Sequence, residues 1–270
     1  MKPKALILLA LGTNRDQDAS EALALAGANP DVLPLNDLRL HKKRFADYQL
    51  LVLPGGFSYA DALGAGRLLA IDLKTYFADE ITAFVDSGRP VLGICNGFQA
   101  LVKSGVLPGC GGRPGEDDQA VNPGSAPTAT LTFNERGHFE CRWVDLRPAS
   151  KKCLWTRGLT TLISCPIAHG EGNFQVDKNS MLPRLIQEDQ VTVTYVRPDG
   201  SPANGEYPFN PNGSLFDIAG ICNPAGNVFG LMPHPENHIH PYQHPNWTRG
   251  VTGQSGLVLF ENGVKYAAGC

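Results

Sequence analysis

Short apolar runs alternate with helix-like stretches over residues 1–105. Apolar side chains recur at helical spacing across 66–86, and an Ala/Leu-rich stretch near 18–27 has the same character. This alternation is typical of an α/β fold in which helices flank a mostly parallel, doubly wound central sheet of the flavodoxin-like kind. The apolar runs that we expect to form its strands are ALILLALG, DVLPLN, QLLVLPGG and VLGI.

The pattern changes in the second half of the chain, where β-like segments predominate. The segments FDIAGICN and NVFGLMPHPE flank the turn PAG, which predicts a β-hairpin whose second strand delivers a histidine at its end. We therefore expect an antiparallel β extension of the parallel sheet, and a closing amphipathic helix within 250–269. The other β-like segments lie at 128–133, 138–146, 161–167 and 191–196.

Length and composition favour a single domain. The chain has 270 residues, of which 42% are hydrophobic and 18% charged, so it can bury a sizeable core. Residues 106–127 are rich in glycine and proline, which predicts a surface insertion. We expect one domain over 1–270 that carries this insertion.

Charge and cysteine content narrow the functional classes. A formal charge of −3 and a pI near 6.2 argue against a nucleic-acid partner. The opening MKPKALILLALG resembles a weak signal peptide, but its apolar run is too short to span a membrane and suits a buried strand. Seven cysteines without paired spacing or a CxxC motif argue against a disulfide framework and a zinc knuckle. A cytoplasmic protein without a membrane partner is expected.

The segment GICNG places Cys95 between an expected strand and an expected helix. Small residues on both sides of a central nucleophile permit the strained turn known as a nucleophile elbow. At a helix N-terminus the helix dipole and free N–H groups favour the thiolate, and the N–H of Asn96 could stabilise an oxyanion. The alternative is a small core cysteine without chemistry.

A thiol nucleophile needs a base and a group that orients this base. The segment GLMPHPE offers His234 at the end of an expected strand, followed two residues later by Glu236. Extended backbone around the prolines allows the carboxylate to fold back toward the imidazole. The alternative is a surface loop with an incidental histidine and a solvated glutamate.

Further histidines crowd the same region, at His238, His240 and His244. Imidazole is a common metal ligand, but the spacing follows no compact zinc pattern and the prolines prevent a regular helix. No metal site is therefore predicted. We expect these three residues to lie in a polar loop packed under Trp247.

Residues 53–66, LPGGFSYADALGAG, place adjacent glycines at the end of an expected strand. The segment lacks the P-loop lysine and the GxGxxG pattern, so it supports nucleotide binding only weakly. Backbone around Gly56 is better suited as a second oxyanion donor opposite the elbow. An ordinary tight turn is the alternative.

Taken in order, PGGFS, GICNGFQ, PIAHGEGNF and GLMPHPE resemble the class I, or triad, glutamine amidotransferases, and within them the glutaminases of the purine pathway. The resemblance implies a parallel sheet flanked by helices and hydrolysis of glutamine through a γ-glutamyl thioester. It implies Cys95 as nucleophile, His234 as general base and then acid, and Glu236 as orienter. The other implied site residues are the backbone of Gly56 and Asn96 as oxyanion hole, with Gln99, His169 and Glu171 holding glutamine or facing the synthetase.

The resemblance also implies a partner. An ATP-dependent large synthetase subunit would use the ammonia to convert formylglycinamide ribonucleotide into its amidine, and a small third subunit is a further partner to consider. ATP and Mg are expected on the synthetase, with no cofactor in this chain. Near Asp61 the chain departs from the family, which commonly has glycine and arginine where Ala60 and Gly64 stand.

Two other functions stay open at this stage. A stand-alone cysteine hydrolase of the same elbow superfamily would act on peptides or acyl substrates without a synthetase. A binding subunit with a structural Cys95 would not react with a glutamine-like electrophile.

Overall fold

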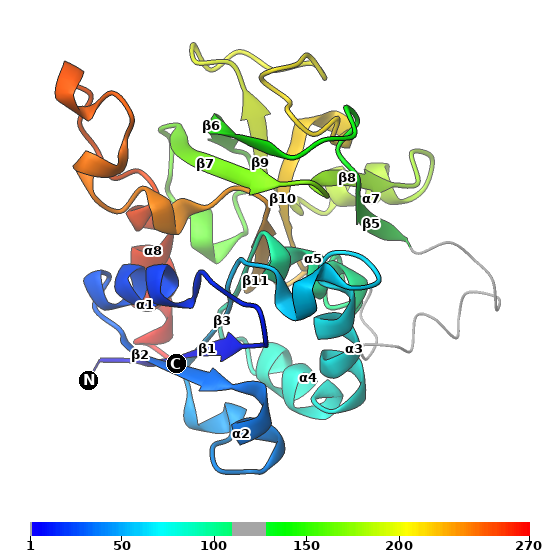
Figure 1. Ribbon diagram of the computed structural model, residues 1–270, viewed down its shortest axis with the longest axis vertical. Helices are drawn as coiled ribbons and strands as arrows, with labels where there is room; N and C mark the ends of the chain where they lie inside the picture. Colours follow the sequence, from blue (N-terminus) through cyan, green and yellow to red (C-terminus); the bar gives the residue numbers. More distant parts are fainter. Residues whose placement is uncertain (1, 110–127) are drawn as a thin grey trace.

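The computed structural model describes residues 2–109 and 128–270. Within these residues, nine strands form one sheet in the order β2, β1, β3, β4, β11, β10, β9, β6 and β7 (Figure 1). Their bounds are β1 Lys4–Leu9, β2 Asn29–Pro34, β3 Leu50–Leu53, β4 Val91–Ile94, β6 Glu140–Pro148, β7 Ile163–His169, β9 Val191–Val196, β10 Ile218–Cys222 and β11 Val228–Leu231.

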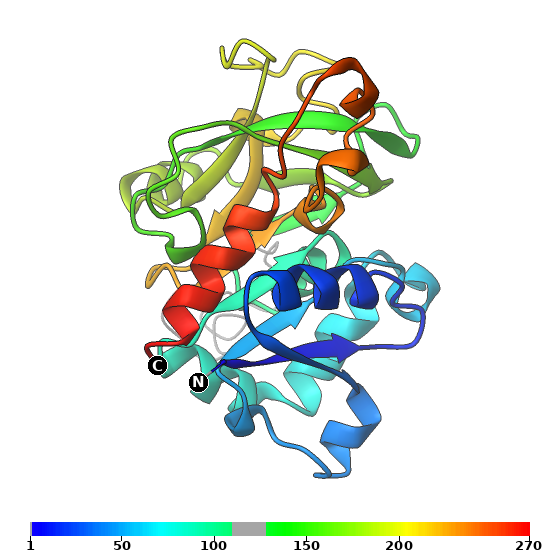
Figure 2. The same ribbon diagram turned by 90° about the vertical axis from the view of Figure 1, so that its left-hand side faces the viewer.

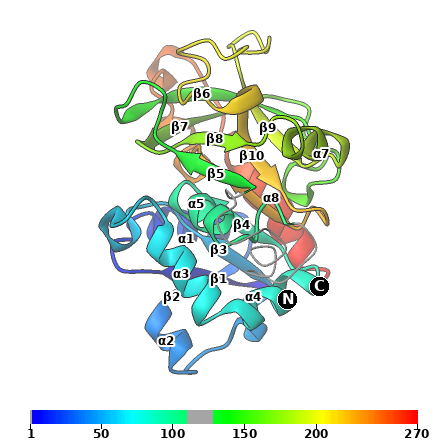
Figure 3. The same ribbon diagram turned by 90° about the vertical axis from the view of Figure 1, so that its right-hand side faces the viewer.

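The strands from β2 to β11 run parallel to one another. Figures 2 and 3 show that helices cover both faces of this part, with α1 and α8 packed together on one face and α3, α4 and α5 on the other. Strands covered on both faces must be apolar throughout, which is why β3 and β4 read as continuous apolar runs and are fully buried. The helices are α1 Asp16–Leu25, α2 Leu35–Arg39, α3 Arg67–Thr75, α4 Ala78–Asp86, α5 Asn96–Lys103, α7 Met181–Gln187 and α8 Leu257–Ala267.

The other half of the sheet is antiparallel. Strands β10 and β11 form the predicted hairpin, and β9, β6 and β7 extend the sheet beyond it. A separate antiparallel pair joins β5, Ala129–Thr132, to β8, Asn173–Val176. The predicted fold class, a mostly parallel sheet with flanking helices and an antiparallel extension, is confirmed.

The helical spacing over 66–86 covers two helices rather than one. The helix α3 ends at Thr75 and α4 begins at Ala78, because Phe77, with φ −126° and ψ 15°, leaves the helical conformation and packs its ring against Phe45. Both helices bury the same side, so the apolar period continues across the break. Spacing alone therefore could not show it.

The connections hold short 3₁₀ turns, and they carry several of the residues discussed below. These turns are η1 Phe45–Asp47, η2 Ser58–Asp61, η3 Leu154–Thr156, η4 Leu215–Asp217, η5 Pro235–Asn237, η6 Pro241–Gln243 and η7 Trp247–Arg249.

Most of the predicted insertion, residues 110–127, lies outside the described residues. At its start, Val106 and Leu107 are buried in the core. The single-domain assignment over 1–270 stays a prediction. No helix in the described part of the chain is long and apolar enough to cross a membrane.

Candidate active site

Cys95 lies between the end of β4 and the first residue of α5, as the GICNG pattern predicts. Its backbone has φ 48° and ψ −103°, a conformation that L-residues adopt only under constraint. Its amide donates to the carbonyl oxygen of Leu231 at 2.8 Å, which ties the turn to the end of β11. The side chain is therefore held at the carboxyl edge of the parallel strands, where α/β sheets bind ligands.

The two glycines of the motif allow α5 to pack closely on the sheet. A Cβ at Gly97 would lie 1.9 Å from the carbonyl oxygen of Leu53 in β3, and one at Gly93 would lie 2.5 Å from Cδ1 of Leu101. The contact at Gly97 is with backbone, so the fit between α5 and the sheet requires glycine there. The nearest contact at Gly93 is with the end of a flexible side chain, and the backbone of Gly97 would follow at 3.0 Å, so this position is tight but less restrictive.

His234 and Glu236 reach the same edge from β11, the parallel neighbour of β4. Nδ1 of His234 lies 2.7 Å from Oε1 of Glu236, and both residues are buried, at 3% and 1% exposure. The amide of His234 donates to the carbonyl oxygen of Pro166 in β7 at 2.8 Å. The carboxylate thus fixes the ring and leaves Nε2 as the nitrogen that can exchange a proton with Cys95.

Electrostatics favour a protonated His234. Burial lowers its pKa, but Glu236 and the sulfur of Cys95 outweigh this effect and raise the pKa to about 10. A thiolate beside an imidazolium is the reactive form of a cysteine nucleophile. The arrangement can therefore perform thiol-based acyl chemistry with a proton donor in place.

Two backbone regions beside Cys95 are candidates for the oxyanion hole. A Cβ at Gly55 would lie 2.6 Å from Cε1 of His234, so the backbone of the PGG turn passes directly against the imidazole. Gly56 lies against Asn14 and has φ 135°. In the described residues, the amides of Gly56 and Asn96 have no hydrogen-bond acceptor in the protein. Both are free to bind a ligand oxygen, and their role as oxyanion donors stays a prediction.

The side chain of Asn96 links the elbow to the 58–61 turn. Its Oδ1 accepts from the amide and the hydroxyl of Ser58, and its Nδ2 donates to Oδ1 of Asp61 at 2.9 Å and to Gln99 at 3.2 Å. Burial raises the pKa of Asp61, a shift that the Asn96 hydrogen bond opposes. Asn96 is therefore immobilised through its side chain, which fixes the direction of its backbone amide.

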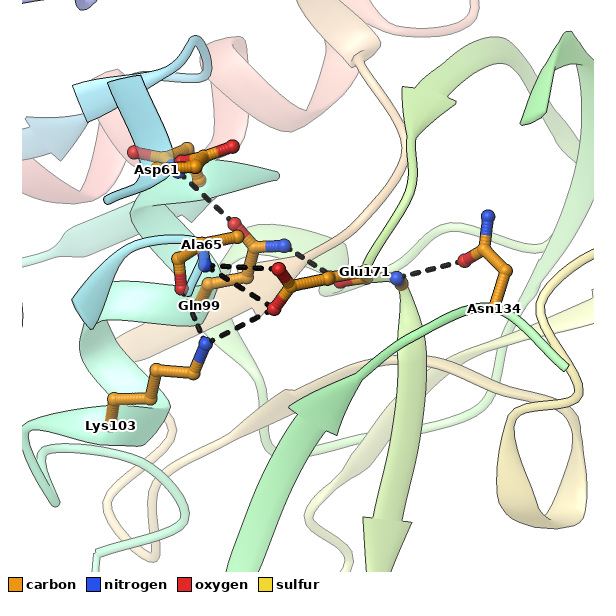
Figure 4. Close-up of polar contacts among 8 residues, drawn as sticks. Asp61, Ala65, Gln99, Lys103, Asn134 and Glu171 are labelled. Atoms are coloured by element: carbon orange, nitrogen blue, oxygen red, sulfur yellow. Dashed lines mark hydrogen bonds and ion pairs between the residues drawn. The ribbon is translucent and has the colours of Figure 1, made fainter. Parts of the chain in front are cut away.

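Gln99 and Glu171 contact each other rather than open space. Nε2 of Gln99 donates to the carbonyl oxygen of Glu171 at 2.6 Å, and Gln99 is only 2% exposed (Figure 4). The Glu171 carboxylate accepts from the amide of Ala65 at 3.2 Å and lies 3.5 Å from Nζ of Lys103. The structure thus gives both residues a supporting position beside the site, and a direct contact with glutamine stays a prediction.

His169 ends β7 and is buried at 3% exposure. A Cβ at Gly172 would lie 2.1 Å from its Cε1, so the ring lies directly against this glycine. Burial and the nearby His234 lower its pKa to about 3. Neither ring nitrogen has a hydrogen-bond partner in the described residues, so His169 presents a neutral imidazole near His234.

Sequence reasoning missed the polar side chains that support the elbow, namely Ser58, the side-chain amide of Asn96, and Lys103. A signal existed for Lys103, which follows Gln99 by four residues on an otherwise buried helix and so shares its face. For Ser58 no local pattern exists, because its contact with Asn96 depends on how two loops meet.

The prediction for the remaining histidines was wrong in one respect. The rings of His238 and His244 pack against Trp143 of β6, at centroid distances of 5.0 and 4.7 Å, whereas Trp247 is 51% exposed. His240 instead pairs with Glu21 on α1 at 2.8 Å. Trp143 is far away in the sequence, so the pattern could not reveal it. In the part of the chain that the structure describes, no three His, Cys, Asp or Glu side chains are arranged to hold a metal ion.

Comparison with known proteins agrees with this geometry. A family model described as a CobB/CobQ-like glutamine amidotransferase domain matches residues 2–267. The phosphoribosylformylglycinamidine synthase subunit PurQ of Treponema denticola is 55% identical over 98% of this chain and 99% of its own length. The protein of the same name from Dehalococcoides mccartyi is 43% identical, with 98% of each chain covered.

A solved structure is also similar. A chain in the structure of PurLQS from Thermotoga maritima superposes with a TM-score of 0.73 at 31% identity, with 98% of this chain and 99% of that chain covered. The agreement therefore extends over the sheet, the elbow and the antiparallel extension. The chain belongs to the glutamine amidotransferase family, in the branch that contains these phosphoribosylformylglycinamidine synthase subunits.

Proposed function

We propose that this chain is the glutaminase subunit of phosphoribosylformylglycinamidine synthase in purine biosynthesis. It hydrolyses glutamine to glutamate and ammonia, which a synthetase subunit consumes. One observation carries the proposal: the buried pair of His234 and Glu236 lies beside Cys95 at the sheet edge, in a chain that matches a PurQ subunit over 98% of its length. The elbow alone would fit many thiol enzymes.

The geometry supports a two-step mechanism. The Cys95 thiolate attacks the side-chain amide carbon, and the amides of Gly56 and Asn96 stabilise the oxyanion. His234, held protonated by Glu236, donates its proton to the departing ammonia and leaves a γ-glutamyl thioester. The neutral imidazole then takes a proton from water, which attacks the thioester and releases glutamate.

The amidine-forming step belongs to another polypeptide. The related solved structure is named PurLQS, which supports a complex with a large synthetase subunit and a third subunit. ATP and Mg act on that synthetase, and this chain uses no cofactor of its own. The cysteines in the described residues are all free thiols, which suits a reducing compartment, and we place the protein in the cytoplasm.

Glutamate release tests the proposal. We would measure it for this chain alone and mixed with the cognate synthetase, ATP and formylglycinamide ribonucleotide, with Cys95→Ala as the control. We expect low release by the free chain, a rise on assembly, and loss of essentially all activity in Cys95→Ala. Release that survives Cys95→Ala would refute the catalytic assignment.

Assembly and substrate range are tested with the same proteins. Equal turnover with and without the synthetase would refute control by assembly. Activity on peptides or acyl esters without glutaminase activity would instead establish the stand-alone hydrolase.

A further inference from the structure

Lys103 is an enclosed cation at the end of the nucleophile helix. Its side chain is 18% exposed, and its ammonium group donates to the carbonyl oxygen of Ala65 and lies 3.5 Å from Oε2 of Glu171. Burial lowers its pKa, whereas Glu171 and Asp61 raise it. Enclosing a lysine is costly unless its partners are well placed, so this site is organised around the charge.

Glu171 connects Lys103 to the other walls of the site. Both carboxylate oxygens lie 3.2 Å from the amide of Ala65, and the backbone carbonyl accepts from Gln99 at 2.6 Å (Figure 4). We call the contacts among Lys103, Glu171, Ala65 and Gln99 the Lys103–Glu171 clamp. It joins the 61–66 segment, the helix α5 and the 169–172 loop.

Each joined segment borders the nucleophile. The helix α5 begins next to Cys95, and the 61–66 segment continues from the PGG turn that passes against His234. The 169–172 loop begins with His169, which lies near enough to His234 for that residue to lower its pKa. Asn134 holds the far side of this loop, donating to the His169 carbonyl at 2.8 Å. The clamp thus holds the side of the 169–172 loop that faces α5, as Asn134 holds the opposite side.

The catalytic groups themselves are held by other contacts. Cys95 is fixed by Leu231, and His234 by Pro166 and Glu236. Loosening the clamp would therefore move the walls around the substrate while the nucleophile and its base stay in place. Gly64 lies close to this group, because a Cβ at that position would be 3.9 Å from the Lys103 ammonium. As a glycine, it adds no side chain to the clamp.

We propose that Lys103 is a positioning residue for glutamine turnover, which acts through Glu171 to hold the 61–66 segment and the 169–172 loop at the spacing that admits glutamine to Cys95. The proposal rests on the glutaminase function above. It predicts a defect in substrate capture with an unchanged thiol, because only the walls shift.

The test compares two electrophiles on the full chain. A diazoketone analogue of glutamine must bind before it alkylates Cys95, whereas iodoacetamide needs no binding site. For Lys103→Met we expect labelling by the analogue to slow about tenfold, as misplaced binding groups do, and KM for glutamine to rise. Iodoacetamide labelling should match the wild type, and Lys103→Arg should restore most of the loss.

Further variants separate the clamp from general stability. Lys103→Met leaves the enclosed Glu171 carboxylate unpaired, so the double variant Lys103→Met/Glu171→Gln removes both charges. It should recover stability yet keep the slow analogue labelling. Glu188→Gln, which breaks an exposed ion pair with Arg184 on α7, is the matched control and should behave as wild type. If Lys103→Met does not fold, Glu171→Gln takes its place.

The outcomes are distinct. If the analogue labels the clamp variants as fast as it labels the wild type, the positioning role is overturned and the glutaminase function stands. Parallel loss of analogue and iodoacetamide labelling together with a lower melting temperature would also overturn it, because it shows a structural role. No labelling of the wild type by the analogue, even after assembly with the synthetase, ATP and formylglycinamide ribonucleotide, would refute the glutaminase function itself.

Discussion

At the scale of single residues, positive backbone φ angles gather around Cys95. Cys95 has φ 48°, and the consecutive residues Tyr59, Ala60 and Asp61 have φ between 52° and 54°. Each such non-glycine residue costs roughly 1 kcal/mol or more. The contacts of Ser58 and Asp61 with Asn96 hold this turn against the elbow. The departure at Ala60, where the family commonly has glycine, falls on one of these positions.

Ala60→Gly should stabilise the chain by about 1 kcal/mol, because glycine adopts positive φ without steric cost. Urea unfolding measures the change. Ala62→Gly is the matched control, since Ala62 is also exposed but has φ −55°. That variant should be neutral or slightly less stable. Destabilisation by Ala60→Gly would contradict the strain argument.

Glu236→Gln should lower the pKa of His234, because it removes the largest influence that raises it to about 10. The ion pair between the His234 imidazolium and Glu236 makes its full contribution to stability below pH 6.5. This contribution disappears as the pH rises toward about 10 and His234 loses its proton. In the variant, glutaminase activity should fall by about a hundredfold or more, and its alkaline limb should move to lower pH.

The pH profile of kcat/KM for glutamine, measured between about pH 6 and pH 10, tests this effect. Glu236→Asp keeps the negative charge at shorter reach and should retain more activity than Glu236→Gln. An unchanged alkaline limb in Glu236→Gln would show that the carboxylate does not govern the proton on His234.

At the scale of elements, Cys95 is placed by the packing of α5 on β3 and β4. The helix approaches so closely that a Cβ at Gly97 would overlap the carbonyl oxygen of Leu53. Parallel pairing of β4 with β11 then brings His234 to the same edge. The geometry of the site therefore depends on the distance between α5 and the sheet, which is short because Gly97 has no side chain.

Gly97→Ala should push α5 away from the sheet. We expect a loss of roughly 1 to 3 kcal/mol in the free energy of unfolding and a fall in glutaminase activity, since overpacking displaces backbone. Denaturant unfolding and steady-state kinetics measure the two effects. Gly269→Ala, whose Cβ would meet only Tyr266 O at 3.5 Å, should change neither. Full activity in Gly97→Ala would contradict the packing argument.

For the whole molecule, the described residues place the parallel and antiparallel halves in one continuous sheet, joined by the β10 and β11 hairpin. The site lies along this junction, with Cys95 and His234 from the parallel half and His169 from β7 in the antiparallel half. The candidate site is thus complete only when both halves are assembled.

We expect the two halves to unfold together. Tryptophan fluorescence reports on Trp143, Trp155 and Trp247, which all lie in the second half of the sequence. Its unfolding transition should coincide with the one followed by far-UV circular dichroism, which reports on the whole chain. Glutaminase activity should be lost in the same transition. Two separated transitions would contradict the single-domain prediction over 1–270.

The sequence could predict much of the fold and the central chemistry. Apolar runs marked the parallel strands, and the PAG turn marked the β10 and β11 hairpin, because both signals act between near neighbours in the chain. The break between α3 and α4 could not be predicted, because both helices bury the same side and the apolar spacing continues across it. The contact of His238 with Trp143 was lost because nothing local specifies a partner so far away.

By itself, the sequence determined which residue types stand at the strand ends: a cysteine between glycines, and a histidine two residues before a glutamate. Local backbone rules are enough for this, since turns and strands depend on adjacent residues. Only the tertiary structure decided which of these groups meet. It turned Gln99 inward to Glu171, enclosed Lys103 between two loops and left His169 neutral beside His234. Such contacts depend on how separate segments pack, and burial then sets their charge.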